Sequence, residues 1–196
     1  MKTALAAGFA DPVDGAQGVF RALLAAMAAP GTIAHLPAEL APPAPMTPGC
    51  AALCLMLADL DTPLWLDRAM AQPAVRRFLQ FHCGAPEVER PAEARFALVA
   101  DPTALPPLDH FDLGSDEQPE LSATLIVQVA GLRTGAGRRL CGPGIDREVG
   151  LEVDGLSDGF WQQRRRHQAL FPLGVDMILV AGTRIAALPR STRLCG

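Results

Sequence analysis

The chain of 196 residues is 49% hydrophobic and 19% charged, which excludes an intrinsically disordered protein. Its formal net charge of −4 gives no indication of a nucleic-acid-binding protein. The charge is unevenly divided, with 7 basic and 15 acidic side chains in residues 1–130 and 10 and 6 in residues 131–196, so an anion-binding surface is expected in the C-terminal third.

The first predicted element is a helix that begins near Asp14, whose side chain can cap free N–H groups, with Gln17 completing a capping box. Apolar residues then recur at every fourth position, as they do on the buried side of a helix, until Pro30-Gly31 ends the pattern. The apolar stripe consists of Val19, Leu23 and Met27 together with Phe20 and Leu24.

The next segments alternate between short strands and helices. Five prolines make Pro37–Pro48 a stiff loop, and Thr47-Pro48 begins a helix that is apolar on all sides and is therefore expected to be buried. A third helix begins at Pro73 and ends before Gly84. Short strands are predicted at residues 32–36, 64–66 and 96–99, followed by an exposed acidic loop at residues 101–120.

Strands dominate the C-terminal part of the chain. Ala123–Ala130 is a nearly continuous apolar run, typical of a strand buried on both faces, and Arg138–Cys141 is expected to pair with it after a turn at Gly135-Ala136-Gly137. The remaining predicted elements are a helix from Ser157 that carries Phe160, Trp161 and three arginines, and a hairpin of Val175–Ala181 and Ile185–Leu188.

This order of elements predicts the fold class. Helices interleave with strands early and strands dominate late, which indicates a three-layer α/β/α fold with a mixed sheet between helical layers. The terminal hairpin argues against a purely parallel sheet. No internal repeat and no long polar linker divides the chain, so residues 1–196 are predicted to form a single domain.

The lysine count excludes several kinds of enzyme. Sixteen of the 17 basic residues are Arg, and the single Lys is Lys2, which is expected to be mobile. Pyridoxal phosphate enzymes, Schiff-base aldolases, P-loop ATPases and protein kinases all depend on a Lys amine. Arg keeps its proton and cannot replace Lys as a base or nucleophile. We therefore expect no cofactor, and no catalytic motif identifies a catalytic residue.

The five cysteines have irregular spacing and include no C-x-x-C, so they indicate neither a disulfide framework nor a zinc ribbon. Cys50 and Cys54 share a helix face and could hold a metal, but no matching ligands occur elsewhere and small core residues are the favoured interpretation. No metal site is predicted.

The N-terminal run that ends at Ala10 is short for a secretory signal, and no run reaches the roughly 18–20 apolar residues of a membrane span. We therefore expect a cytoplasmic protein with reduced thiols and no membrane partner.

Two glycine-rich turns flank Arg138–Cys141, of which the second is Gly142-Pro143-Gly144. Gly142 and Gly144 could present backbone amides to an anion, helped by Arg138 or Arg139. The alternative is a pair of tight turns without a ligand. A dinucleotide-binding loop is disfavoured because the third glycine is missing and no helix follows.

Other candidates are single side chains. His82 is placed at a helix C-terminus, where it could act as a general acid or serve as a cap or core residue. Asp176 begins an apolar strand and needs a cationic partner, for which Arg184 and Arg190 are the candidates. Asp59 and Asp61 could bind Mg²⁺ but are more typical of a turn, and His167, beside three arginines, is expected at the surface.

Six blocks of the sequence match one family in order and spacing. They are Phe20-Arg21 with Leu23-Leu24, Met27 and Pro30-Gly31; Leu57–Asp59 with Asp61–Leu66; Phe81-His82 with Ala85-Pro86; Ala123–Val129; Gly142–Ile145; and Phe171–Leu179 with Leu188–Thr192. Together these blocks resemble the PhnH family, a subunit of the bacterial carbon–phosphorus lyase system, over nearly the whole chain.

The resemblance implies a role in phosphonate breakdown, in a core complex with the subunits PhnG, PhnI and PhnJ. With ATP, that assembly attaches a phosphonate to ribose C1, displaces adenine and leaves a ribose 1-phosphonate 5-triphosphate. It further implies a homodimer and a fold similar to that of pyridoxal-phosphate transferases without the cofactor site. The family supplies no catalytic residues, so the implied role is that of an accessory subunit.

The ligand-binding candidates are Arg138, Gly142, Gly144, His82, Asp176 and Arg190. A non-catalytic subunit of a transferase complex is favoured over an independent enzyme. The alternatives are a stand-alone nucleotide- or phosphonate-binding protein that uses the arginine-rich turns, and a purely structural scaffold dimer.

Overall fold

The computed structural model describes residues 5–195, so Lys2 and the first residues of the N-terminal run lie outside them. The helices of this part are α1 (Pro12–Ala28), α2 (Pro48–Leu57), α3 (Pro73–His82) and α4 (Asp158–His167). The strands are β1 (Ala34–His35), β2 (Leu64–Leu66), β3 (Phe96–Val99), β4 (Thr124–Gln128), β5 (Gly131–Cys141), β6 (Val149–Asp154), β7 (Asp176–Ala181), β8 (Arg184–Leu188) and β9 (Arg193–Leu194).

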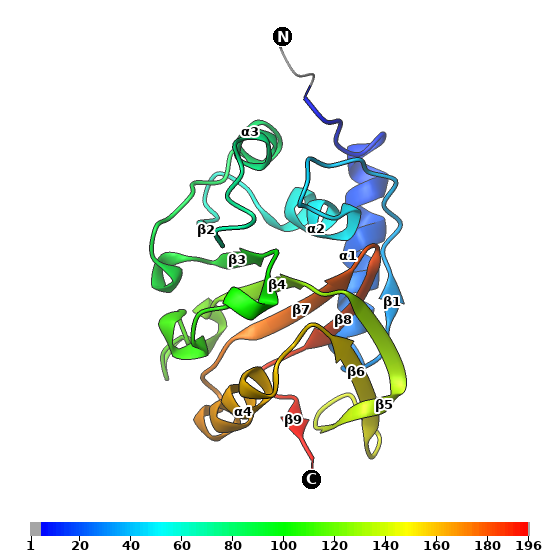
Figure 1. Cartoon of the computed structure of the whole chain (residues 1–196), viewed down its shortest axis with the longest axis vertical. Helices are drawn as coiled ribbons and strands as arrows, with labels where there is room; N and C mark the ends of the chain where they lie inside the picture. The colour runs from blue at the N-terminus through cyan, green and yellow to red at the C-terminus, as the bar shows by residue number, and fades with distance from the viewer. Residues whose placement is uncertain (1–4, 196) are drawn as a thin grey trace.

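The main sheet has the strand order β1-β8-β7-β4-β3-β2 (Figure 1). Strands β2, β3, β4 and β7 run parallel to one another, whereas β8 is antiparallel to both β7 and β1. The sheet is therefore mixed, and the predicted hairpin around Gly182-Thr183 is confirmed as β7 and β8.

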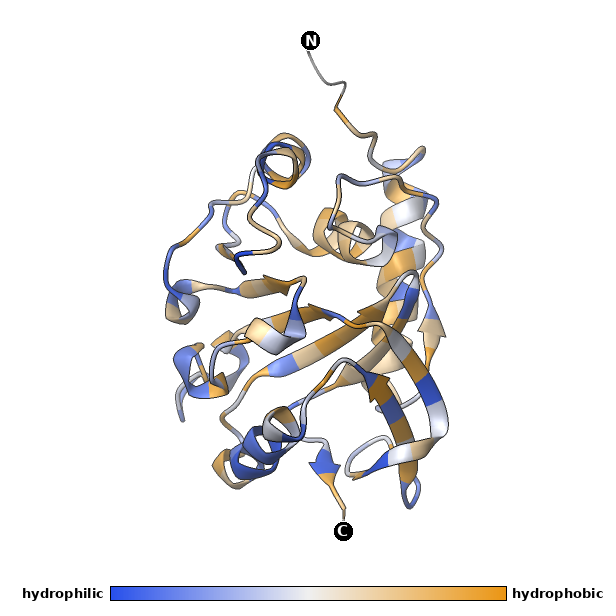
Figure 2. Ribbon diagram, in the orientation of Figure 1, coloured by the Kyte–Doolittle hydropathy of each residue, from blue (hydrophilic) through white to orange (hydrophobic). Residues whose placement is uncertain are grey.

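Alternate residues of the central strands enter two separate apolar cores, one on each face of the sheet. Leu98 and Ile126 pack with residues of α1, α2 and α3. Val99 and Val127 pack with residues of α4, β5 and β6. Figure 2 shows the corresponding band of apolar residues through the central strands, beside a largely polar α4. The prediction of two helical layers is thus wrong on one side, where a single helix shares the layer with strands.

That layer contains a second sheet, of order β6-β5-β9, which the sequence patterns did not predict. Strand β5 pairs antiparallel with β6 and β9, so the predicted pairing of Arg138–Cys141 with Ala123–Ala130 is wrong. The register shifts between Thr134 and Arg138, and Gly135 and Gly137 have φ of 97° and 85°. These glycines therefore form an irregularity inside β5, and not the turn that was predicted before Arg138–Cys141.

Helix α1 begins two residues before the predicted cap. The Asp11 carboxylate accepts hydrogen bonds from the N–H groups of Val13 at 2.9 Å and Asp14 at 3.0 Å, and Pro12 occupies the first turn, where its missing N–H is harmless. Val19 and Leu23 are buried as predicted, but Phe20 and Leu24 are 52% and 56% exposed. The prediction included both faces of the helix because local spacing does not show which face meets the sheet.

Helix α2 is the buried helix that the sequence predicts. The Thr47 hydroxyl caps it by accepting a hydrogen bond from the Cys50 N–H at 3.4 Å, and Gly49–Cys54 are all buried. Cys50 and Cys54 are core residues, and the Cys83 thiol donates to the Cys54 carbonyl at 3.6 Å. The hydrogen bond with Cys50 and then burial raise the pKa of Cys54, and burial raises the pKa of Cys83 to about 11. The Cys54 and Cys83 thiols are therefore protonated and unreactive at neutral pH.

The expectation that all thiols are reduced is wrong for one pair, because Cys141 and Cys195 form a disulfide. Cys141 ends β5, and its Cα lies 6.1 Å from that of Cys195, which follows β9. The two are 54 residues apart, and the pairing of β5 with β9, Leu140 with Leu194 and Cys141 with Arg193, brings them together. The spacing of the cysteines in the sequence does not indicate which strands pair, so it could not predict this disulfide.

Thiol counting tests this arrangement. We expect the native, non-reduced protein to give no rapid reaction with a thiol reagent, since the three free cysteines are buried. Denaturation without reductant should expose three thiols, and denaturation with reductant should expose all five cysteines. Five reactive thiols in the denatured, non-reduced protein would contradict the disulfide.

The predicted acidic loop at residues 101–120 is more ordered than expected. It contains short 3-10 turns, and its Leu108 and Phe111 side chains are 0% and 3% exposed. The Phe111 ring meets Trp65 of β2 edge-on at 5.7 Å between ring centroids. Burial of these two side chains attaches an otherwise polar segment to the core. No helix within residues 5–195 has both the length and the hydropathy needed to cross a membrane.

Candidate functional site

The predicted ion pair between Asp176 and Arg190 is present and lies where the β7–β8 hairpin ends. The Asp176 carboxylate accepts the Arg190 backbone N–H at 2.7 Å and contacts its guanidinium at 3.1 Å. The guanidinium also donates to the Pro119 carbonyl. The two side chains are 15% and 18% exposed, so the arginine head is held in place rather than free in solvent.

A second guanidinium, which the sequence prediction missed, lies behind this pair. Arg164 of α4 is 3% exposed and donates to the carbonyls of Val175 at 3.0 Å, Leu188 at 3.3 Å and Pro189. Burial lowers the pKa of Arg164 to about 10, and the charge of Asp176 opposes that shift. Arg164 therefore remains a cation at neutral pH.

The helical spacing contained the signal for this residue. Arg164 follows Phe160 by four residues and Trp161 by three, so the three side chains share one side of α4, and all three are buried. Arg165 and Arg166, the other members of the triplet, are exposed. A charged residue at the buried position of a helix needs internal partners, which the three carbonyls and Asp176 provide.

A cavity of about 350 Å³ lies beside Arg190. It is lined by Pro143, Gln168, Phe171, Arg190, Ser191 and Arg193. The polar lining offers guanidinium, amide and hydroxyl groups, and no carboxylate is among the lining residues. The Gln168 Nε2 is buried without a hydrogen-bond partner within residues 5–195. Such a lining suits a ligand with several acceptor oxygens.

The predicted turn Gly142-Pro143-Gly144 reaches this cavity only through Pro143. Gly144 has φ of 80°, and a Cβ there would lie 2.1 Å from the Ala28 carbonyl oxygen. A Cβ on Gly142 would lie 2.8 Å from the Ser191 carbonyl oxygen. Both glycines are thus explained by close backbone approach, which fastens the turn to the end of α1 and to the Arg190 segment.

Arg138 lies outside this cavity. Its guanidinium pairs with the Asp158 carboxylate and lies 5.8 Å from the centre of the Trp161 ring. These residues line a separate cavity of about 310 Å³. The structure therefore does not bring Arg138 together with Arg190.

His82 is the last residue of α3, as predicted, and α3 lies at the opposite end of the molecule from α4 and β9 (Figure 1). Its Nε2 lies 2.9 Å from the Ala6 carbonyl oxygen. Its ring packs against Phe78 and Phe81 at centroid distances of 4.6 Å and 5.0 Å. These contacts agree with the capping and core interpretation, and His82 takes no part in the arginine-lined cavity.

The prediction of His167 at the surface needs correction. The residue is half-buried, and its Nδ1 is buried without a hydrogen-bond partner among the described residues. Burial is the main cause that lowers the pKa of His167, and Arg164 and Arg166 lower it further while Asp109 opposes them. The neighbouring arginines are therefore a smaller cause of the lowered His167 pKa than burial is.

Asp59 and Asp61 form the predicted turn. Asp59 Oδ1 accepts from the Asp61 N–H at 3.0 Å and from the Thr62 hydroxyl at 2.5 Å. These bonds lower the pKa of Asp59, Thr62 being the larger cause. In residues 5–195 no group of three His, Cys, Asp or Glu side chains is placed to hold a metal ion.

Comparison with known proteins relates the chain to one family. The model of the family described as "Bacterial phosphonate metabolism protein (PhnH)" matches residues 7–195. The chain is 40% identical over 186 residues to "Alpha-D-ribose 1-methylphosphonate 5-triphosphate synthase subunit PhnH" of Rhizobium meliloti (strain 1021), which covers 95% of this chain and 93% of the relative. It is also 49% identical over 82 residues, 42% of each chain, to HtxG of Stutzerimonas stutzeri, a protein whose name associates it with C-P lyase. The chain therefore belongs to the PhnH family of bacterial phosphonate metabolism proteins.

Proposed function

We propose that this chain is an accessory subunit of an α-D-ribose 1-methylphosphonate 5-triphosphate synthase that acts in organic phosphonate breakdown. The observation that carries the proposal is the 40% identity to a subunit of that name, which extends over 95% of this chain and 93% of the relative. The family model matches residues 7–195, which include both sheets and all four described helices, and not only a shared motif.

The finer parts of the proposal follow the family resemblance. We propose that the chain assembles with PhnG, PhnI and PhnJ, that it forms a homodimer, and that it works in the cytoplasm as one domain. The proposed fold relation is to pyridoxal-phosphate transferases without their cofactor site. The charged, hydrogen-bonded cluster of Asp176 and Arg190 supports a binding role for this region.

Copurification and growth test the proposal together. A strain that lacks its own subunit of this kind is given a tagged copy of the chain and is grown on methylphosphonate as the sole source of phosphorus. We expect growth to be restored and the three partner subunits to copurify with the tag. The Rhizobium meliloti relative serves as the positive control and the empty vector as the negative one. A folded, expressed chain that neither restores growth nor copurifies with partners would contradict the proposal.

A further inference from the structure

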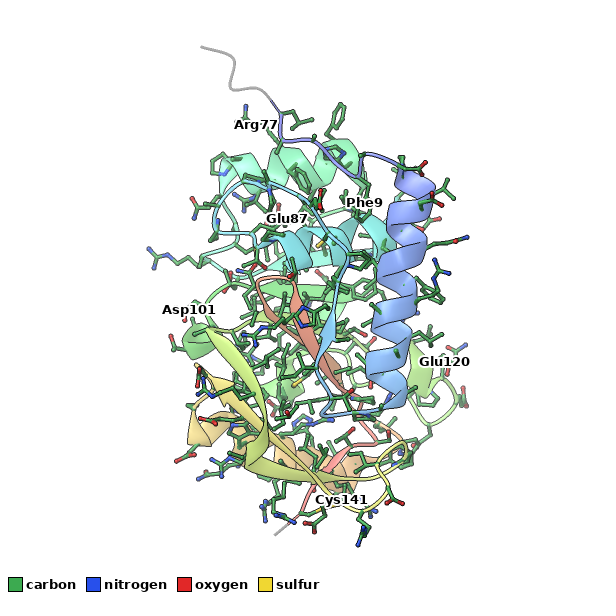
Figure 3. The ribbon with its side chains drawn as sticks, turned by 90° about the vertical axis from the view of Figure 1, so that its right-hand side faces the viewer. Phe9, Arg77, Glu87, Asp101, Glu120 and Cys141 are labelled. Atoms are coloured by element: carbon green, nitrogen blue, oxygen red, sulfur yellow. A yellow bond between two sulfur atoms is a disulfide. The ribbon has the colours of Figure 1, made fainter. Side chains whose placement is uncertain are left out.

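We propose that the cavity lined by Pro143, Gln168, Phe171, Arg190, Ser191 and Arg193 is a binding site for a phosphate-type oxyanion, and that its ligand is a triphosphate group. It lies between the 3-10 turn Gln168–Leu170, which follows α4, and the segment that leads from β8 to β9. In Figure 3 the neighbouring Cys141 lies at the opposite end of the molecule from Arg77 of α3.

The first argument is the balance of charge around the cavity. The buried Arg164 and the nearly buried Arg190 share one carboxylate, that of Asp176. Arg193 is exposed and has no ion-pair partner within residues 5–195. The cavity lining thus contains two guanidinium groups and no carboxylate, and the Asp176 charge is shared between Arg190 and the buried Arg164, which leaves an excess of positive charge that an anion can neutralise.

The second argument is the geometry of the donors. Arg190 is fixed on one side by the Asp176 carboxylate and the Pro119 carbonyl, so its orientation is set before any ligand arrives. Gln168 lines the cavity, and its Nε2 is buried with no hydrogen-bond partner among the described residues, which leaves one donor beside the cavity without an acceptor. The Ser191 hydroxyl adds a further donor on the lining.

The third argument selects the ligand. A volume of about 350 Å³ accommodates a chain of phosphoryl groups and exceeds what a single phosphonate needs. The excess positive charge also favours a polyanion over a small anion with one or two charges. The preference for an oxyanion follows from the cavity alone, whereas the choice of a triphosphate rests on the proposed function.

Calorimetry on the full chain at low ionic strength tests the site, with inorganic triphosphate, methylphosphonate and sulfate as separate probes. We expect triphosphate to bind tighter than the other two. Arg193→Gln should weaken triphosphate binding at least tenfold, since the side chain lines the cavity and makes no ion pair that folding needs. Arg77→Gln, which removes an equal charge from exposed α3, should change it less than twofold.

Arg190→Gln should abolish triphosphate binding. If the loss of the Asp176 contact unfolds the Arg190 variant, Arg193→Gln decides the question. Absence of triphosphate binding, or equal losses in the Arg193 and Arg77 variants, would overturn the site. Tighter binding of methylphosphonate than of triphosphate would overturn the choice of ligand. Copurification of Arg193→Gln with the partner subunits is measured separately, so the proposed function can stand if the site fails.

Discussion

Replacing Asp176 with Asn is expected to lower the free energy of unfolding by about 3 kcal/mol, the size typical of removing one partner from a buried ion pair. Asn keeps the shape of the side chain and can still accept the Arg190 N–H, which is 2.7 Å from the carboxylate in the native protein. The substitution removes the Asp176 charge, which is the one negative charge among the causes of the shifted Arg164 pKa. The Arg164 side chain is 3% exposed. Two guanidinium groups would then lack their shared counter-charge.

Urea denaturation followed by circular dichroism measures this loss. Asp146→Asn is the matched control, because its side chain is 97% exposed and 3.8 Å from Arg147, and its effect should stay within about 0.5 kcal/mol. Adding Arg164→Met to the Asp176 variant should recover about 1 kcal/mol, since one unpaired cation is removed. A loss below about 1 kcal/mol in Asp176→Asn would mean that the carboxylate is not the counter-charge of this cluster.

The Asp176–Arg190 pair was predictable because each residue can be recognised from its own neighbours in the sequence. A carboxylate at the start of an apolar strand needs a cation, and the sequence offered two arginines, one on each side of the partner strand predicted at Ile185–Leu188. The structure selects Arg190, while Arg184 donates instead to the Leu132 carbonyl at 3.1 Å. The sequence therefore reduced the candidate partners of Asp176 to two arginines, and the position of the hairpin end determines which of them pairs with it.

Local cues likewise predicted the elements whose borders depend on neighbours in the chain. Thr47-Pro48 begins α2, Ser157 caps α4, and the strands Leu64–Leu66 and Phe96–Val99 have the predicted bounds. Each is an apolar run or a capping residue, and Thr47 and Leu64 also lie next to a proline. Such patterns are fixed within a few residues, so a single sequence contains them.

The second sheet could not be predicted in the same way. Strand β5 has seven consecutive exposed residues, Arg133–Arg139, and β6 contains two acidic side chains that pair with Arg133. Strand β5 has so little apolar alternation that it resembles a loop when taken alone, whereas Val149, Leu151 and Val153 of β6 do alternate, a strand pattern that the sequence prediction missed. Strand β9, in contrast, pairs with β5 between residues that are far apart in sequence, Leu140 with Leu194, and this pairing places Arg193 beside the cavity.

Removing the Cys141–Cys195 disulfide by Cys195→Ser is expected to lower the free energy of unfolding by about 3 kcal/mol. Loop-closure entropy alone gives about 4 kcal/mol for a sequence separation of 54 residues, and measured values are commonly smaller. The structural consequence is local. Strand β9 has only two residues and is paired through Leu194 and Arg193, so without the covalent link it should separate from β5.

Separation of β9 would displace Arg193 from the cavity wall, so the same variant should bind triphosphate more weakly than the native chain does. Denaturation curves and calorimetry are compared for the native protein and for Cys195→Ser, each with and without reductant. Reductant should lower the stability of the native protein to that of the variant and leave the variant unchanged. Cys141→Ser combined with Cys195→Ser should behave like the single variant, which excludes an effect of the thiol left behind. If reductant does not destabilise the native protein, the disulfide has no stabilising role. If triphosphate binding is unchanged in Cys195→Ser, the position of Arg193 does not depend on the disulfide.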